Sequence, residues 1–286
     1  MRRSAILVIT ILAAAVFLIS YIADIYGKSA EEYYIEGVKK YDKDRFGDAI
    51  VEFDRAIKVD PRYAPAYYKM GCIYIVISQP SKAIKYFEKS IELNPQYAAP
   101  YYSMGEAYYS MGKMGQAIKF WTKSIEMDPK FFSPYNAFGD MYLLTGKNTE
   151  AIEYFLKAIK INPRDYHANF SIGLAYQRLN QYQQALDYFQ RTAGINPKLA
   201  AAYHQMGATY ELMGETEQAI FFYQKAIKED TSHADSYFAA GLAYEKLGKL
   251  KEAQDYLVRA GEIYEAGGER EGFSRTEAAL EKLKKK

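Results

Sequence analysis

The sequence predicts an all-α protein: a right-handed helical solenoid of about seven helix pairs with a C-terminal capping helix, preceded by one transmembrane helix. Two columns of small residues carry the solenoid prediction, because each recurs every 34 residues without an insertion. They are Gly37, Gly71, Gly105, Gly139, Gly173, Gly207 and Gly241, and Ala49, Ala83, Ala117, Ala151, Ala185, Ala219 and Ala253. A fixed period of this length is the signature of a repeat array. A long apolar run near the N-terminus carries the transmembrane prediction.

Residues 98–131 show the repeated unit. Apolar and small residues from Tyr101 to Tyr108 fall at i, i+3, i+4 and i+7, which places them on one helical face. A second helix is indicated by the same pattern from Ala117 to Ile125. The break between the two helices holds residues that tolerate a left-handed backbone, namely Gly112, Gly146, Asn180, Gly214 and Gly248.

Each second helix is expected to end at an Asp-Pro or Asn-Pro pair, since proline lacks an amide donor and disfavours helix in the preceding residue. These pairs lie at residues 60–61, 94–95, 128–129, 162–163 and 196–197. The small Gly and Ala columns let the two helices of a pair approach, and an aromatic column should fill the space beside each crossing. Its members are Phe53, Phe87, Trp121, Phe155, Phe189 and Tyr223. One pair cannot bury its apolar faces alone, so neighbouring pairs must stack.

With these residues the chain resembles a tetratricopeptide repeat (TPR) array. The period of 34 residues, the closing proline, an aromatic four places before the Gly column and a tyrosine three places after it match that family. The resemblance implies repeats at 30–63, 64–97, 98–131, 132–165, 166–199, 200–233 and 234–265. The first copy departs from the pattern at Glu36 and Lys40, the fifth copy has Asn169 in place of the aromatic, and the last two lack the closing proline.

Residues 1–28 lie outside the repeats and contain the apolar run from Ala5 to Ala23, which is 19 residues long. At 1.5 Å per residue a helix of this length spans roughly 28 Å, close to the hydrocarbon thickness of a bilayer. We favour a retained signal-anchor over a cleaved signal peptide, because the apolar core is long and its end lacks a good cleavage site. Arg2 and Arg3 should stay in the cytoplasm, which places the array on the extracytoplasmic side. Two alternatives are a cytosol-facing receptor, resembling TPR import receptors, and a secreted adaptor released by cleavage.

A partner-binding groove is predicted on the face of each first helix that is turned away from the second helix. The candidate groove residues are Tyr34, Tyr68, Tyr102, Glu106, Tyr109, Asn136, Asp140, Phe170, His204 and Phe238. An aromatic row with scattered acids suits a peptide or helix that carries apolar or aromatic side chains. The alternative is that these aromatics only fill space between neighbouring first helices. Some TPR relatives hold a C-terminal carboxylate with Lys, Arg and Asn on this face. The corresponding places in this chain are mostly Tyr, Phe, Glu and Asp, so we do not expect such a clamp.

Catalytic, metal and nucleic-acid functions are not expected. The sequence has no Gly-rich phosphate loop, no His-Glu helix motif and no paired cysteine, since Cys72 is the single cysteine. Lys and Arg number 37 against 35 Asp and Glu, which is no basic footprint for nucleic acid. His167 and His204 occupy consecutive first helices and are expected near each other, but a metal site would need a further ligand. The function expected is that of a non-enzymatic scaffold for protein partners without a cofactor, with self-association left open.

The tail, residues 269–286, is predicted to form one last helix that caps the array. Phe273, Thr276, Leu280 and Leu283 recur at steps of three and four residues, which gives this helix one apolar face. A stacked array leaves its final apolar face uncovered, so this helix should pack there with its charged residues in water.

Overall fold

A computed structural model of the protein describes residues 27–285, and these residues form α-helices joined by short turns. The chain divides at residue 131 into two compact units, each of which is described here by itself. The expected membrane segment, residues 5–23, lies outside the described residues. Within residues 27–285 no helix combines the length and the apolar character that crossing a bilayer requires.

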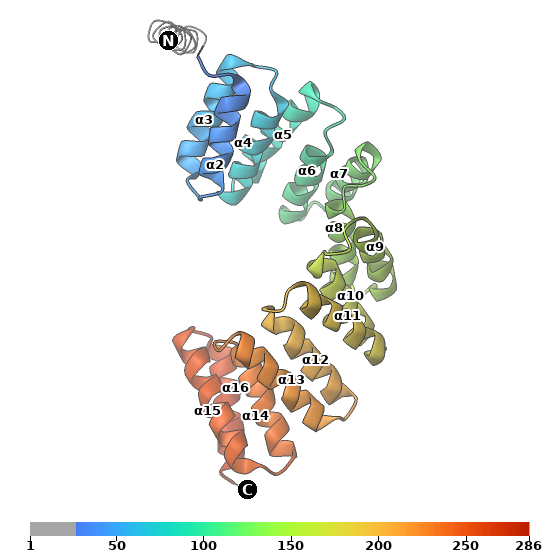
Figure 1. Cartoon of the computed structure of the whole chain (residues 1–286), viewed down its shortest axis with the longest axis vertical. Coiled ribbons are helices and arrows are strands. Elements are labelled where there is room, and N and C mark those ends of the chain that lie inside the picture. The colour runs from blue at the N-terminus through green and yellow to red at the C-terminus, as the bar shows by residue number, and fades with distance from the viewer. Residues whose placement is uncertain (1–26, 286) are drawn as a thin grey trace, which may run out of the picture. The chain divides into compact units, whose positions relative to one another are not determined.

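The first unit contains three helix pairs in its described part (Figure 1). Within each pair the two helices pack together, and the second helix of the first and of the second pair also packs against the first helix of the pair that follows. The helices are α2 (Ala30–Tyr41), α3 (Phe46–Val59), α4 (Ala64–Val76), α5 (Pro80–Leu93), α6 (Ala98–Ser110) and α7 (Met114–Met127).

The second unit contains four further pairs and one additional helix. It is built by the same contacts, and the additional helix, α16, packs against α15 and α14. The helices are α8 (Ser133–Leu144), α9 (Asn148–Ile161), α10 (Tyr166–Arg178), α11 (Tyr182–Ile195), α12 (Ala200–Leu212), α13 (Thr216–Glu229), α14 (Ala234–Lys246), α15 (Leu250–Ala266) and α16 (Arg270–Leu283).

The turn between the two helices of each pair depends on a single left-handed residue. Gly112 has φ 72° and Asn180 has φ 58°, which confirms the prediction made for this column. Asp44 and Ser78, which were not predicted, take the same conformation at φ 55° and 59° in the first two copies. The backbone amide of the residue after the left-handed one donates to a carbonyl in the last turn of the first helix, which ends the helix. In the third pair Lys113 donates to the carbonyl of Tyr108 over 2.9 Å.

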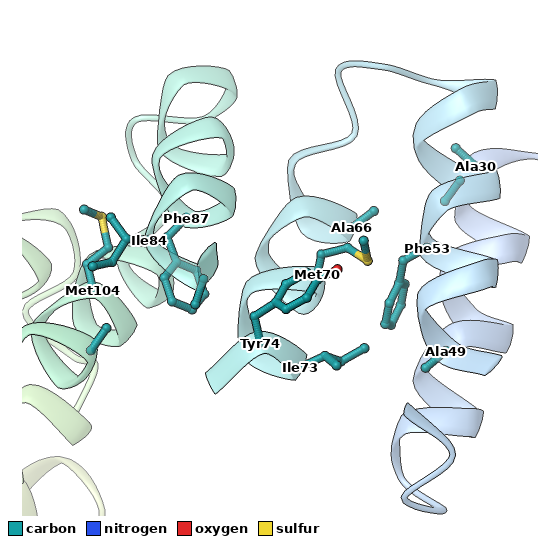
Figure 2. Close-up of a cluster of buried hydrophobic side chains, with 13 residues drawn as sticks. Ala30, Ala49, Phe53, Ala66, Met70, Ile73, Tyr74, Ile84, Phe87 and Met104 are labelled. Atoms are coloured by element: carbon teal, nitrogen blue, oxygen red, sulfur yellow. The ribbon is translucent and has the colours of Figure 1, made fainter. Parts of the chain in front are cut away.

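The helix crossings are tight because the Gly column has no side chains. A Cβ atom on Gly105 would lie 2.3 Å from the Trp121 ring, and one on Gly139 would lie 2.6 Å from the Phe155 ring. The facing aromatic column is buried at every crossing, which confirms the predicted packing. Figure 2 shows Phe53 and Phe87 in the core of the first unit.

The C-terminal helix α16 covers the end of the second unit through Gly272, Thr276 and Leu283, which are buried. Its charged side chains are exposed, as expected from the sequence, and two of them also contact residues of α14. The Arg275 guanidinium lies 4.7 Å from the centre of the Phe238 ring, and Lys282 pairs with Glu245 at 3.3 Å. Both contacts arise because α16 packs on α14 as well as on α15.

Candidate functional site

The ten candidate groove residues all lie on the first helices of their pairs. Tyr34, Tyr68, Tyr102, Glu106 and Tyr109 belong to the first unit, and Asn136, Asp140, Phe170, His204 and Phe238 to the second. Asp140 is exposed and Phe238 is buried, while the other eight are partly buried. We call the residues of each unit its inner row.

In the first unit the inner row is a series of aromatic pairs. Tyr34, Tyr68 and Tyr102 each meet, edge to face, an aromatic residue that comes shortly before the next first helix. The ring centres are 5.5 Å apart for Tyr34 and Tyr63, 5.2 Å for Tyr68 and Tyr97, and 5.5 Å for Tyr102 and Phe131. This edge-to-face geometry is a preferred arrangement of aromatic rings, so the pairs stabilise the repeat as well as line its surface.

The sequence suggested that Tyr34 and Tyr68 are turned away from the second helix, but both lie against it. Tyr34 lies 5.7 Å from the centre of the Phe53 ring, and Tyr68 lies 5.9 Å from that of Phe87. The cause is the Gly column, which is three residues further along the same helix. Because Gly37 has no side chain, the Phe53 ring lies over it and reaches the neighbouring Tyr34.

Apart from the Glu106 carboxylate, the inner row of the first unit is aromatic. Burial raises the pKa of the Tyr34 and Tyr68 hydroxyls and of the Cys72 thiol beside Tyr68, so all three groups are neutral near pH 7. One cation lies nearby, the Lys69 ammonium, which is 5.0 Å from the centre of the Tyr41 ring. A ligand at this surface would therefore meet mainly ring edges and apolar atoms.

In the second unit polar pairs replace the aromatic ones. The Asn136 amide donates to Asp165 Oδ2 over 2.6 Å, and Asp165 also accepts from the backbone amides at the start of α10. Asp140 lies 3.3 Å from His167 Nε2. The hydrogen bond from His167 to Asp140 raises the pKa of the imidazole above its ordinary value.

The sequence led us to expect His167 and His204 near each other, but they lie in different clusters. His204 Nδ1 is 3.0 Å from Ser236 Oγ, and its ring centre is 5.2 Å from that of His233. Burial, with a smaller effect of His233, lowers the pKa of His204 to about 4. The separation has a simple cause: His167 stands at the start of α10 and reaches back to α8, whereas His204 stands one turn into α12 and reaches forward. Within residues 27–285 no three His, Cys, Asp or Glu side chains are placed to share a metal ion.

The residues that contact the inner row were not predicted from the sequence. Tyr63, Tyr97, Phe131, Asp165 and His233 all occupy the last place of a 34-residue copy. A signal was present, because each matches its inner-row residue in chemical type: aromatic with aromatic, carboxylate with amide, and imidazole with imidazole.

Stacked helix pairs of constant length define an α-helical repeat protein of the solenoid class. Family models described as tetratricopeptide repeat match residues 64–97, 98–131, 166–199, 200–233 and 222–255, and one described as TPR repeat matches 139–180. Together these matches cover residues 64–131 and 139–255. The chain belongs to the tetratricopeptide repeat family.

Solved structures with the same fold include that of MamA, which is 30% identical with a TM-score of 0.54 over 58% of this chain and 97% of MamA. The structure titled "YrrB: a TPR protein with an unusual peptide-binding site" is 26% identical, with a TM-score of 0.52 over 62% of this chain and 91% of YrrB. PilW, described as a type IV pilus biogenesis factor, has a TM-score of 0.64 at 18% identity over 74% of this chain and 97% of PilW, and shows the fold alone. No curated protein matches the sequence.

Proposed function

We propose that this chain is a non-enzymatic scaffold, anchored in a membrane by residues 5–23, whose repeats bind peptides or helices of partner proteins. In this proposal the array lies on the extracytoplasmic side and serves the assembly of envelope or secretion complexes. The observation that carries the binding role is the aromatic inner row of the first unit. Tyr34, Tyr68 and Tyr102 are held by ring pairs yet remain partly exposed. The peptide-binding site named for YrrB supports a peptide as the ligand.

The chemistry of this row favours a partner with apolar or aromatic side chains. Rings that are fixed in place lose little freedom when a ligand binds, and partly buried aromatics are the residues that most often dominate binding energy. The Tyr34 hydroxyl is protonated near pH 7, so it can donate a hydrogen bond to a peptide carbonyl, whereas the Tyr68 hydroxyl already interacts with Cys72 and Ser103.

The binding role is tested by replacing Tyr34, Tyr68 and Tyr102 together with leucine, which keeps apolar volume but removes the ring edges. The matched control replaces Tyr74 and Tyr108, which stack on Tyr86 and Phe120 instead of lining the inner row. Both variants should lose some stability, but only the first should lose more than about tenfold in capture of the partner crosslinked in membranes. Equal loss of capture in the two variants would show that the inner row acts only in packing.

The placement is tested separately. The native protein should stay with membranes through a high-salt wash, and protease added to opened cells from the extracytoplasmic side should digest the repeats. A reporter that works only in the cytosol, fused after Lys286 and found active, would favour the cytosol-facing receptor. A soluble product that begins near Tyr21 or Asp24 would favour the cleaved, secreted adaptor.

A further inference from the structure

The repeat at residues 166–199 departs from the other copies in a way that hollows the surface formed by the second helices α9, α11 and α13. We call this surface the outer face of the second unit. A pocket of about 310 Å³ lies between α9 and α11 and is lined by Ile159, Pro163, Asn169, Arg191 and Ile195. A second pocket of about 430 Å³ lies between α11 and α13 over Leu186 and Met206. α11 therefore has an apolar pocket on each side.

The first pocket is the space that a tyrosine ring takes in the other copies. Six copies have a tyrosine where the fifth has Asn169: Tyr33, Tyr67, Tyr101, Tyr135, Tyr203 and Tyr237. Tyr67 and Tyr101 each reach the proline that closes the preceding copy, donating to the carbonyls of Pro61 and Pro95 over 3.2 Å. The equivalent proline, Pro163, lines the pocket, because the Asn169 amide turns back to the Asp165 carbonyl at 2.8 Å.

The second pocket lies beside two small residues at the end of α11. In place of Ala193 five copies have isoleucine: Ile57, Ile91, Ile125, Ile159 and Ile227. In place of Gly194 the other six have a charged residue: Lys58, Glu92, Glu126, Lys160, Lys228 and Glu262. Both small residues line the pocket, whose walls include the rings of Tyr203 and Phe222. Beside it, Phe221 is 57% exposed.

Each pocket also carries a cation that lacks an acidic partner. Arg191 lines the first pocket and Lys225 the second, and neither forms an ion pair within residues 27–285. They lie over the rings of Tyr188 and Tyr203, at 4.9 and 5.0 Å from the ring centres. At the same place in other copies, Lys89, Lys123 and Arg259 pair with the glutamate three residues on.

The missing partner has a direct cause in the sequence. Three residues after Arg191 stands Gly194, and three residues after Lys225 stands Lys228, so neither cation has the glutamate that pairs with Lys89, Lys123 and Arg259. Among the residues that line the two pockets one is acidic, Asp187, which accepts a hydrogen bond from Gln183 over 3.4 Å.

We propose that the outer face of the second unit binds an extended acidic peptide of a partner protein. One apolar or aromatic side chain of the peptide enters each pocket, and acidic side chains near them pair with Arg191 and Lys225. Even directly packed helices lie about 8 to 10 Å apart, and an extended chain advances about 3.3 Å per residue. The second helices α9, α11 and α13 do not contact one another, so the two apolar side chains are at least about three residues apart. This site is separate from the inner row and does not depend on the function proposed for it.

The test uses a random dodecapeptide display library panned on the full-length protein in detergent, with counter-selection on a refilled double variant. That variant, Asn169→Tyr with Gly194→Lys, restores the residue types of the other copies. Its fold is expected to be retained, because a Cβ on Gly194 meets no atom within 4 Å and a tyrosine at residue 169 has the Pro163 carbonyl as a partner. Peptides kept by the counter-selection should be acidic with two apolar residues three or more places apart.

A synthetic copy of one selected peptide then gives dissociation constants by fluorescence anisotropy. We expect at least about tenfold weaker binding to the refilled variant, to Arg191→Gln and to Lys225→Gln, and weaker binding with added salt. Lys123→Gln, at the same place of α7 in the first unit, should leave the affinity unchanged. The proposal is wrong if no peptide survives counter-selection, if the survivors are basic or lack apolar residues, or if the charge variants bind as the parent does.

Discussion

Lys40 and Glu52 form an ion pair across the first helix pair, at the place where each of the six following pairs sets two aromatic rings against each other. The Glu52 side chain is only 5% exposed. Lys40 departs from the repeat pattern of the sequence, and the structure shows that Lys40 and Glu52 together replace the two aromatic residues of the other pairs. Hydrogen bonding to Lys40 lowers the pKa of the Glu52 carboxyl.

Removing one partner of this ion pair should lower the free energy of unfolding more than replacing both partners with aromatic residues. Lys40→Met leaves Glu52 buried without its main partner and should lower the free energy of unfolding by about 1 to 3 kcal/mol, less than for a fully buried pair because Lys40 is 30% exposed. The double variant Lys40→Tyr with Glu52→Phe should have a free energy of unfolding equal to or greater than that of the parent. Urea unfolding of the three proteins checks this, and a double variant weaker than Lys40→Met would contradict it.

The same pair should make the first repeat sensitive to acid. Since the pKa of Glu52 is lower in the folded chain than in the unfolded one, its contribution is complete above the unfolded value and is lost as the pH falls through the folded value. Thermal midpoints measured from pH 7 to pH 3 should therefore fall less steeply for the double variant than for the parent. Parallel curves would contradict this prediction.

The tight crossings give a matched pair of glycine variants in one helix pair. Gly105→Ala should lower the free energy of unfolding by about 1 to 3 kcal/mol, since the new methyl group would overlap the buried Trp121 ring. Gly115→Ala, in α7, meets no atom within 4 Å and should raise it by up to about 1 kcal/mol. Denaturant unfolding of both variants measures the difference, and a harmless Gly105→Ala would refute the packing account.

The pKa values of His167 and His204 are shifted in opposite directions, so the two residues should make stability depend on pH in opposite ways. His204, with a pKa lowered to about 4, stays neutral in the folded chain, so stability falls as the pH drops from about 6.5 towards 4, by on the order of 2 kcal/mol. His167 has a raised pKa, so its contribution is complete below the unfolded value and is lost as the pH rises through the folded one. NMR titration of the ring protons checks both directions. His204→Phe should flatten the acid branch of the stability curve.

The capping helix should be needed by the second unit. A chain ended at Gly268 uncovers Tyr264 and Phe238, which are 3% and 9% exposed with α16 in place. We expect a loss of roughly 2 to 5 kcal/mol and association of the truncated chains, because apolar surface is exposed to water. Light scattering and thermal unfolding measure these effects. Arg275→Ala, which removes only the cation over Phe238, should cost no more than about 1 kcal/mol.

The fold was predictable because each structural role recurs in seven copies, so Gly105 and Trp121 could be assigned from spacing alone. The inner row was harder. Helical spacing places Tyr68 on a face, but it does not show that the Phe87 ring reaches that face over a residue without a side chain. The partner of Asn136 was missed because Asp165 lies in a loop, outside any helical period. The pockets beside α11 depend on atoms that are missing from one copy, which only the packed structure turns into a volume.

The pairs Tyr34 with Tyr63, Asn136 with Asp165, and His204 with His233 each join two residues of the same 34-residue copy. Duplicating or excising a whole copy counted from Ala30 therefore carries both members of a pair along. A genetic exchange between the two helices of a copy would instead separate them, as when the first helix of 64–97 is joined to the second of 166–199 and Tyr68 faces Leu199. The array is thus free to lengthen or shorten in blocks that bring their own surface chemistry, while exchange inside a block is penalised.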